Sequence, residues 1–265
     1  MKFGVVSDIH GNLPALQAVV ADGQAQQVQR WLNLGDIVSG PLWPAETADW
    51  LMARAWPAIA GNHERQVLTR PRARLSATDR HTADLLLPQH REWLAALPAA
   101  MDAAPGLHCV HGTPASDLEY LLETVTPAGL REARDDEVAA RLRSLPPAAA
   151  GAPVTLLLCG HTHLPRDRVV AGGLRVVNPG SVGLPAYDDD HPFAHVVENG
   201  TPHARYALVE HTPEGWRVDL RAVAYDWEAA ARQAEAHGRG DWADALRSGR
   251  VGRFEREVVS PPPAD

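Results

Sequence analysis

Residues 2–16, KFGVVSDIHGNLPAL, are the stretch of sequence that decides the fold. Positions 2–7 form a short apolar run, which is typical of a buried β-strand. Asp8 and His10 follow it directly. Over 13–28, apolar residues at 13, 16, 19 and 20 have the spacing of an amphipathic helix. A buried strand, a polar turn and an amphipathic helix in succession indicate the start of an α/β domain.

The same alternation continues downstream. Strands are predicted at 31–34 and 57–60, with a helix at 45–56 between them. This βαβαβ order predicts a parallel sheet with helices on its faces. Segment 65–76 is rich in arginine and has no periodicity, so we expect a loop there. The pattern also predicts helices at 78–87, 89–97, 118–125 and 137–145, strands at 107–110 and 154–159, and an Ala/Pro/Gly connector at 146–153.

The C-terminal half has a different pattern. Short antiparallel strands are predicted around 169 and at 174–177, 204–209 and 216–223, followed by helices at 227–237 and 242–248, and 261–263 begins a disordered end. Within 184–203, the run from Asp188 to His191 is expected in a solvated loop in preference to an extra metal or substrate site. Trp216, Trp227 and Trp242 are expected to pack in the interior, or to form a contact in a homo-oligomer.

Length and composition limit the classes of protein to consider. The 265 residues fit one large α/β domain, and the net charge of -8 without a basic run makes a nucleic-acid partner unexpected. The N-terminal apolar run is too short for a signal peptide, and no apolar stretch has the length of a membrane span. Cys109 and Cys159 lack CxxC spacing, which favours buried thiols over a disulfide framework. We therefore expect a cytoplasmic protein without a membrane partner.

Potential metal ligands recur where the predicted strands end. Because open α/β sheets bind ligands beyond the carboxyl ends of their strands, these groups can converge in space. Each one alone has another explanation, such as a helix cap for Asp8 or a buried, hydrogen-bonded histidine for His111. Together, the carboxylate, imidazole and amide groups suit Mn, Fe, Zn or Ni better than Ca. The residues are Asp8, His10, Asp36, Asn62, His63, Glu64, His111, His161 and His163.

The order of these groups adds a resemblance. The blocks D-x-H (8–10), G-D (35–36), G-N-H-E (61–64), H-G (111–112) and G-H-T-H (160–163) resemble the signature of calcineurin-like metallophosphoesterases. SDIHGNLPAL (7–16) and NPGSVG (178–183) are similar to the bacterial branch that is often described as phosphodiesterases. The resemblance covers 1–226 and implies an α/β fold, a four-layer αββα sandwich of two mixed β-sheets flanked by helices. We expect 227–255 to form a helical extension packed on it, and 256–265 a flexible tail.

The resemblance also implies a role for each motif residue. One of two divalent transition-metal ions, with Mn favoured, would be held by Asp8, His10, Asp36 and His163. The other would be held by Asp36, Asn62, His111 and His161, so that Asp36 bridges the pair. His63 would be catalytic and would assist the leaving group, while a metal-bridging hydroxide attacks phosphorus.

The substrate implied is a small phosphorylated molecule, with a phosphodiester favoured. Eukaryotic protein phosphatases of this family carry an arginine soon after the second block, but the stretch 35–41, GDIVSGP, has none. Asn12 and Arg65 are candidate substrate contacts, although Asn12 could instead cap the first helix. The alternatives are a phosphomonoesterase or a dinucleoside-polyphosphate hydrolase with the same site. A non-catalytic protein-binding scaffold would require gaps in the motif set, and there are none.

Overall fold

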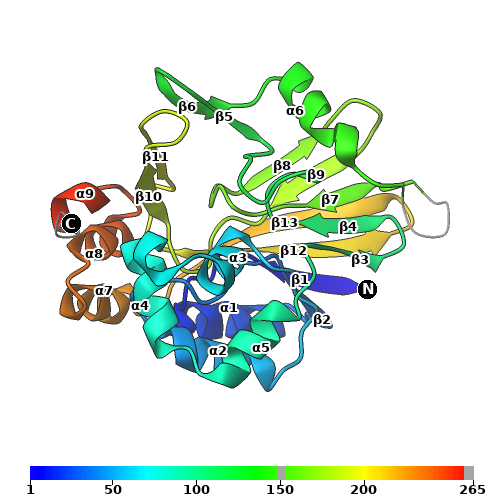
Figure 1. Cartoon of the computed structure of the whole chain (residues 1–265). Coiled ribbons are helices and arrows are strands. Elements are labelled where there is room, and N and C mark those ends of the chain that lie inside the picture. Colours follow the sequence, from blue (N-terminus) through cyan, green and yellow to red (C-terminus); the bar gives the residue numbers. More distant parts are fainter. Residues whose placement is uncertain (148–152, 260–265) are drawn as a thin grey trace.

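The computed structural model describes residues 1–147 and 153–259 and contains two mixed sheets (Figure 1). The first sheet has the order β13-β12-β1-β2. In it, β1 runs parallel to β2 and antiparallel to β12, which pairs in turn with β13. Its strands are β1 (Lys2–Val6), β2 (Arg30–Asn33), β12 (Ala204–Thr212) and β13 (Gly215–Val223).

The second sheet has the order β3-β4-β7-β9-β8. Its three inner strands are mutually parallel, and both edge strands are antiparallel to them. The two sheets face each other through an apolar core in which Val5 and Val209 meet Leu107 and Leu156. The strands are β3 (Ala100–Ala104), β4 (Leu107–Val110), β7 (Leu156–Leu158), β8 (Arg166–Val169) and β9 (Arg175–Asn178).

Helices cover the two outer faces of this pair of sheets (Figure 1). Val19 and Leu51, from α1 and α2, pack with Val6 and Tyr206 over the first sheet. Val138 of α6 packs with Val176 on the far side of the second sheet. The predicted four-layer αββα sandwich of mixed sheets is therefore confirmed. The helices are α1 (Leu13–Ala25), α2 (Pro44–Met52), α4 (Ala77–Leu85), α5 (Pro88–Ala95) and α6 (Asp135–Arg141).

Two predictions in the middle of the first half are wrong. The strand expected at 57–60 is reduced to one bridge between Asn33 and Ala58. The loop expected at 65–76 begins instead inside the helix α3 (Asn62–Thr69), and a short 3₁₀ turn, Arg72–Arg74, follows it. The carboxylate of Glu64 accepts the backbone N–H of Gly61 at 2.8 Å, and this cap stabilises the beginning of α3.

Two further segments form strands that the sequence did not predict. Segment 118–125 is not helical, because it ends in β5 (Glu123–Thr126), paired with β6 (Gly129–Glu132). The guanidinium of Arg141 donates to the carbonyls of Leu121 and Glu123 at 3.1 and 2.9 Å, which withdraws those acceptors from any helix. The loop expected in 184–203 is a hairpin of β10 (Ala186–Asp189) and β11 (His195–Glu198).

The chain ends in the helices α7 (Trp227–Ala236), α8 (Gly240–Ser248) and α9 (Glu255–Val258). Ala230 and Trp242 pack there with Leu42 and Leu184 from earlier in the chain. Helix α9 occupies the beginning of the segment 256–265 that we expected to be a flexible tail. The predicted disordered end at 261–263 lies outside the described residues, as do positions 148–152 of the predicted connector.

The two cysteines are buried free thiols, as predicted. Burial raises the thiol pKa of both Cys109 and Cys159, so neither is activated as a nucleophile. Among the described residues, no helix is both long and apolar enough to cross a membrane.

Candidate metal centre

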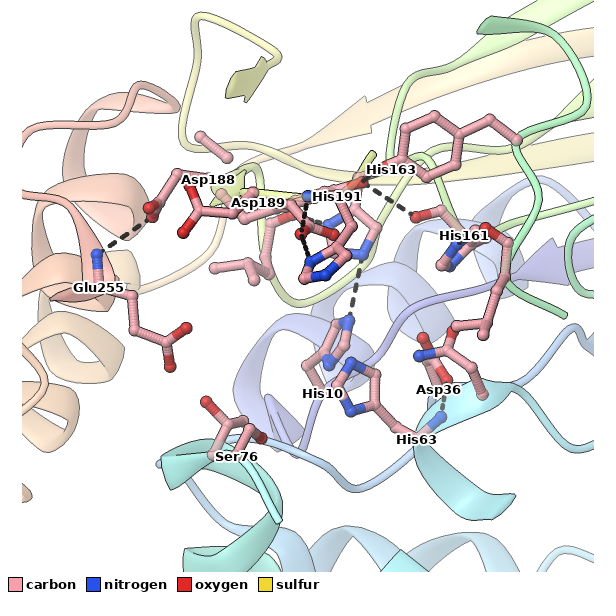
Figure 2. A pocket seen from close by; sticks show the side chains of 18 of the residues that line it. His10, Asp36, His63, Ser76, His161, His163, Asp188, Asp189, His191 and Glu255 are labelled. Atoms are coloured by element: carbon pink, nitrogen blue, oxygen red, sulfur yellow. Dashed lines mark hydrogen bonds and ion pairs between the residues drawn. The ribbon is translucent and has the colours of Figure 1, made fainter. Parts of the chain in front are cut away.

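The predicted ligands come together at one edge of the two sheets. Asp8 and His10 follow β1, and Asp36 follows β2, while His111 follows β4 in the facing sheet. Figure 2 shows His10, His163, Asp36 and His161 around one side of a cavity, with His10 and His163 pointing toward each other. The sheet edge thus gathers side chains that are more than 150 positions apart in sequence, such as those of His10 and His163.

The donor atoms form two groups. The ligand atoms of Asp8, His10 and His163 lie within 4.8 Å of one another, and so do those of Asp36, His111 and His161. In the second group, Nε2 of His111 is 3.1 Å from Oδ2 of Asp36 and 3.1 Å from Oδ1 of Asn62. All seven predicted ligands therefore belong to one of two adjacent groups. A bridging role for Asp36 stays a prediction.

Backbone strain is concentrated at these ligands. Asp8, His10, Asp36, His161 and His163 have φ between 50° and 70°, the left-handed region. A non-glycine residue in a sparsely populated region costs about 1–3 kcal/mol and persists only where its surroundings hold it. Hydrogen bonds between the loops supply that restraint. The N–H groups of Asp8 and His10 donate to the carbonyls of Gly35 and Asp36, both at 3.0 Å.

Two glycines allow the loops to approach this closely. A Cβ at Gly61 would lie 2.2 Å from Oδ1 of Asp36, and one at Gly160 would lie 2.0 Å from Oγ of Ser7. Neither approach is compatible with a side chain, because real Cβ atoms do not come so near. The glycines of the G-N-H-E and G-H-T-H blocks are therefore required by packing around the ligands.

Each histidine ligand donates its other ring N–H to a backbone carbonyl. Nδ1 of His10, His111 and His163 lies 2.6, 2.8 and 2.8 Å from the carbonyls of Ser39, Leu34 and Leu184. His161 is reversed, with Nε2 3.1 Å from the carbonyl of Leu118. A carbonyl only accepts, so in the neutral ring the remaining nitrogen carries the lone pair. This is the arrangement that metal-binding histidines require.

The electrostatics of the site also favour metal binding. Burial, reinforced by neighbouring histidines, lowers the pKa of His10 to about 3 and of His161 to about 4, so both are neutral at pH 7. Burial opposes ionisation of Asp36, but the adjacent His111 outweighs it and holds the pKa of that carboxyl well below its usual range. Burial likewise opposes protonation of His111, but Asp36 raises its pKa to about 10. A metal ion would displace that proton.

His63 lies beside the ligands but bonds elsewhere. Its backbone N–H donates to Oδ1 of Asp36 at 3.0 Å, and its Nδ1 lies 2.7 Å from Oδ1 of Asp79. Burial disfavours the charged imidazole, but Asp79 and Asp36 outweigh it and raise the pKa of His63 to about 10. Its ring is directed at a carboxylate and not at the ligand atoms. It is therefore suited to hold a proton at the edge of the metal groups.

Asp79 was not predicted from the sequence. Its side chain is buried on α4, where Oδ1 also accepts the hydroxyl of Ser39 at 2.6 Å. The only local signal is the spacing Ser76-x-x-Asp79, in which Ser76 accepts the N–H of Asp79 at 3.0 Å. That pattern indicates a helix start and gives no sign that the carboxylate reaches His63.

Glu64 is a second residue whose role the sequence did not reveal. Its carboxylate is buried and accepts three backbone N–H groups, from Asp36, Ile37 and Gly61, each at 2.8 Å. It thereby joins the turn that carries Asp36 to the turn that carries Asn62. Burial and the charge of Asp36 raise the pKa of Glu64, although these bonds oppose the shift.

The N-P-G-S segment supports the ligand loops in a similar way. Nδ2 of Asn178 donates to the carbonyl of Gly160 at 2.8 Å, beside the two histidines of the G-H-T-H block. Oγ of Ser181 donates to the carbonyl of Asp8 at 2.8 Å. This segment therefore fastens the ligand loops of the two sheets to each other.

The two candidate substrate contacts lie away from the cavity lining. Oδ1 of Asn12 accepts the N–H of Ala15 at 3.2 Å as a helix cap, and its Nδ2 donates to Gly183 and Tyr225. The guanidinium of Arg65 forms a bidentate pair with Asp117 at 2.7 and 2.8 Å. Their polar atoms are thus used within the protein, and neither residue lines the cavity.

The two groups of ligand side chains face a cavity of about 1540 Å³. The 116–125 segment, the β10–β11 hairpin, the beginning of α4 and the C-terminal helices form its other walls. In Figure 2, Ser76, Asp188 and Glu255 lie across this space from His10 and His63. Trp242 of α8 also contacts the site, because its ring packs edge-on against His10 with centroids 5.8 Å apart. The cavity therefore has ample room for a small phosphorylated substrate.

The αββα sandwich with paired Asp/His groups at one sheet edge agrees with the metal-dependent phosphoesterase family that the sequence motifs resemble. The model of the calcineurin-like phosphoesterase superfamily domain matches residues 1–199, and the chain belongs to that superfamily. The helices from residue 227 onward lie beyond the matched part.

Solved structures agree with this assignment. A metallophosphoesterase from Sphaerobacter thermophilus is similar at 25% identity and a TM-score of 0.69, over 93% of this chain and 99% of that one. A hypothetical protein from Pyrococcus horikoshii OT3 shares the fold at 21% identity and a TM-score of 0.70, over 95% of this chain and 99% of that one. A search of curated proteins found none that matches the chain.

Proposed function

We propose that this protein hydrolyses phosphodiester bonds with two divalent transition-metal ions, of which Mn is favoured. The observation that carries the proposal is the pair of adjacent ligand groups with His63 beside them. Asp8, His10 and His163 would hold one ion, and Asn62, His111 and His161 the other, with Asp36 shared. Bound metals at such a site activate water and neutralise charge on the phosphoryl oxygens.

The chain's own residues would do the rest of the chemistry. The carbonyl bonds of the histidine ligands keep their lone pairs directed into the site, so little reorganisation is needed. His63, held protonated by Asp79, would give its proton to the departing alkoxide oxygen. The buried Asp79 keeps the imidazole in one orientation during this transfer.

The charges around the cavity support a diester over a monoester. A monoester dianion calls for a guanidinium that is free to bind it. Arg239 is paired with Asp241 and Glu255, and Arg253 is paired with Asp244. Arg141 donates to backbone carbonyls, and Arg65 is paired with Asp117. Most guanidinium groups near the site therefore already have partners.

One observation favours the phosphomonoesterase as a second candidate. Arg70 lies at the end of α3, lines the cavity and has no carboxylate partner among the described residues. Arg256 also lines the cavity and likewise has no carboxylate partner among the described residues. Either guanidinium could reach a substrate dianion. Arg70 is therefore the better candidate for the substrate contact that the sequence analysis assigned to Arg65.

The proposal is tested on protein that has been freed of metal and then loaded with Mn²⁺. Hydrolysis of bis-p-nitrophenyl phosphate should appear with Mn²⁺, disappear with chelator and be lost in Asp36→Asn. Metal content, measured by elemental analysis, should approach two ions per chain and fall in the variant. Full metal loading without hydrolysis of any phosphoester would favour the scaffold. Cytoplasmic location and self-association stay predictions from the sequence.

A further inference from the structure

The C-terminal helices make a contact that leads to His63. Arg239, at the beginning of α8, is buried with only 6% of its surface exposed, and it lines the cavity. Its Nη1 donates to the hydroxyl of Thr78 at 2.5 Å. Its Nε and Nη2 donate to Asp241 at 3.0 and 2.6 Å, and Nη2 also donates to Glu255 at 3.0 Å. The guanidinium therefore joins α8 and α9 to α4.

Thr78 lies in the first turn of α4, directly before Asp79. The carboxylate of Asp79 is held through one of its two oxygens. Oδ1 bonds to His63 and to Ser39, whereas Oδ2 is buried without any hydrogen-bond partner among the described residues. The position of this carboxylate consequently depends on where the first turn of α4 lies. The bond from Arg239 to Thr78 fixes that turn from the cavity side.

We propose that Arg239 is a positioning residue, which acts through Thr78 and Asp79 to keep His63 aimed at the leaving oxygen. The proposal rests on the phosphoesterase activity proposed above. It gives the C-terminal helices, which the family model does not cover, a part in the reaction. Loss of the contact would let the first turn of α4 shift, and small misplacements of a catalytic group can cost about 10²-fold in rate.

Thr78→Val is the sharpest test, because it removes the hydroxyl and keeps the shape and the Arg239 ion pairs. Two diesters are compared, one with p-nitrophenol and one with unsubstituted phenol as the leaving group. We expect kcat to fall about 10-fold for phenol and less than about 3-fold for p-nitrophenol, since a poor leaving group depends more on protonation. Thr78→Ser, which keeps the hydroxyl, should cleave both diesters at the wild-type rate.

A double-mutant cycle separates positioning from general damage. Thr78→Val should lower the rate in the wild-type background and leave it unchanged in a His63→Ala background, because Thr78 affects the rate only through His63. Equal losses in both backgrounds, or equal losses for the two leaving groups, would overturn the proposal. Arg239→Gln should follow Thr78→Val in selectivity if it remains folded.

A measurement that does not need turnover completes the test. The proton on Nδ1 of His63, bonded to Asp79, should give a downfield NMR signal in metal-free protein, identified by its loss in His63→Gln. The signal should weaken in Thr78→Val and return in Thr78→Ser. If the signal weakens in Thr78→Val but the wild type cleaves no phosphoester, the proposed function fails and the positioning contact stands. An unchanged signal in Thr78→Val would refute the contact's role, whatever the activity.

Discussion

Nε2 of His10 lies 3.1 Å from Nε2 of His163, and both rings are buried, so this contact needs either a proton or a cation between the two nitrogens. Both Nδ1 atoms donate to carbonyls, of Ser39 and of Leu184, so in the neutral rings both Nε2 atoms carry lone pairs. Two lone pairs at this distance repel each other, and a cation between them turns the repulsion into attraction. The relationship is the strongest physical sign of metal binding in the site.

The first prediction follows from this repulsion. Metal-free protein should melt at a lower temperature than Mn²⁺-loaded protein, because an ion that binds only the folded state stabilises it by about 4 kcal/mol at 1,000 times its Kd. His163→Ala should remove most of the Mn²⁺-induced rise in Tm and lower metal content. His211→Ala, which changes an exposed histidine on β12, should keep the full rise. Equal rises in both variants would argue against this site.

The second prediction concerns the proton on His63. His63→Ala should retain metal and lower kcat by about 10²–10⁴-fold on substrates with poor leaving groups. Elemental analysis and rates on the two diesters measure both quantities. Loss of an ion in this variant would instead make His63 a ligand.

The third prediction is a shift in pH dependence. A general acid works only while protonated, so activity should fall as pH rises through the pKa of His63. Asp79 is the main group that raises this pKa, acting against burial. In Asp79→Asn the alkaline limb of the kcat profile should therefore move to lower pH. A limb that stays in place, or moves to higher pH, would exclude His63 as the group that titrates.

The fourth prediction concerns close packing at Gly61. Gly61→Ala would put a methyl group 2.2 Å from Oδ1 of Asp36, so the carboxylate must move and metal content should fall. Gly172→Ala is the matched control, because its Cβ would meet nothing within 4 Å. Its positive φ of 86° costs about 1–2 kcal/mol of stability. Metal content near two ions in both variants would contradict the assignment of Asp36.

The sequence predicts which side chains gather at the sheet edge, but it does not predict the residues that support them, for a physical reason. Asp8, His10 and Asp36 follow apolar strands, and the common edge of a sheet brings strand ends together whatever their separation in sequence. Asp79 and Arg239 lie on polar helices, where a carboxylate or guanidinium is usually solvated. Long-range contacts bring them to the site, namely the bond of Asp79 to Ser39 and that of Arg239 to Thr78, and no local pattern records those contacts. The helix predicted at 118–125 is wrong for a similar reason. The carbonyls of Leu121 and Glu123 accept hydrogen bonds from Arg141, which lies much later in the sequence.

The fifth prediction concerns the substrate, and it depends on how the cavity arginines are paired. Bis-p-nitrophenyl phosphate carries one negative charge, which metal ions can neutralise unaided, whereas p-nitrophenyl phosphate as a dianion requires a further cation. Because Arg239 and Arg253 are bound to carboxylates, the diester should have the higher kcat/KM.

Arg70→Ala should then leave diester hydrolysis within about 3-fold of wild type, since an exposed guanidinium outside the reacting groups contributes little to binding one charge. Arg74→Ala, a charge removal from the neighbouring 3₁₀ turn that does not line the cavity, is its matched control. A preference for the monoester that disappears in Arg70→Ala and survives in Arg74→Ala would make this protein a phosphomonoesterase. The ligand groups would be unchanged by that result, because Arg70 contacts none of their donor atoms.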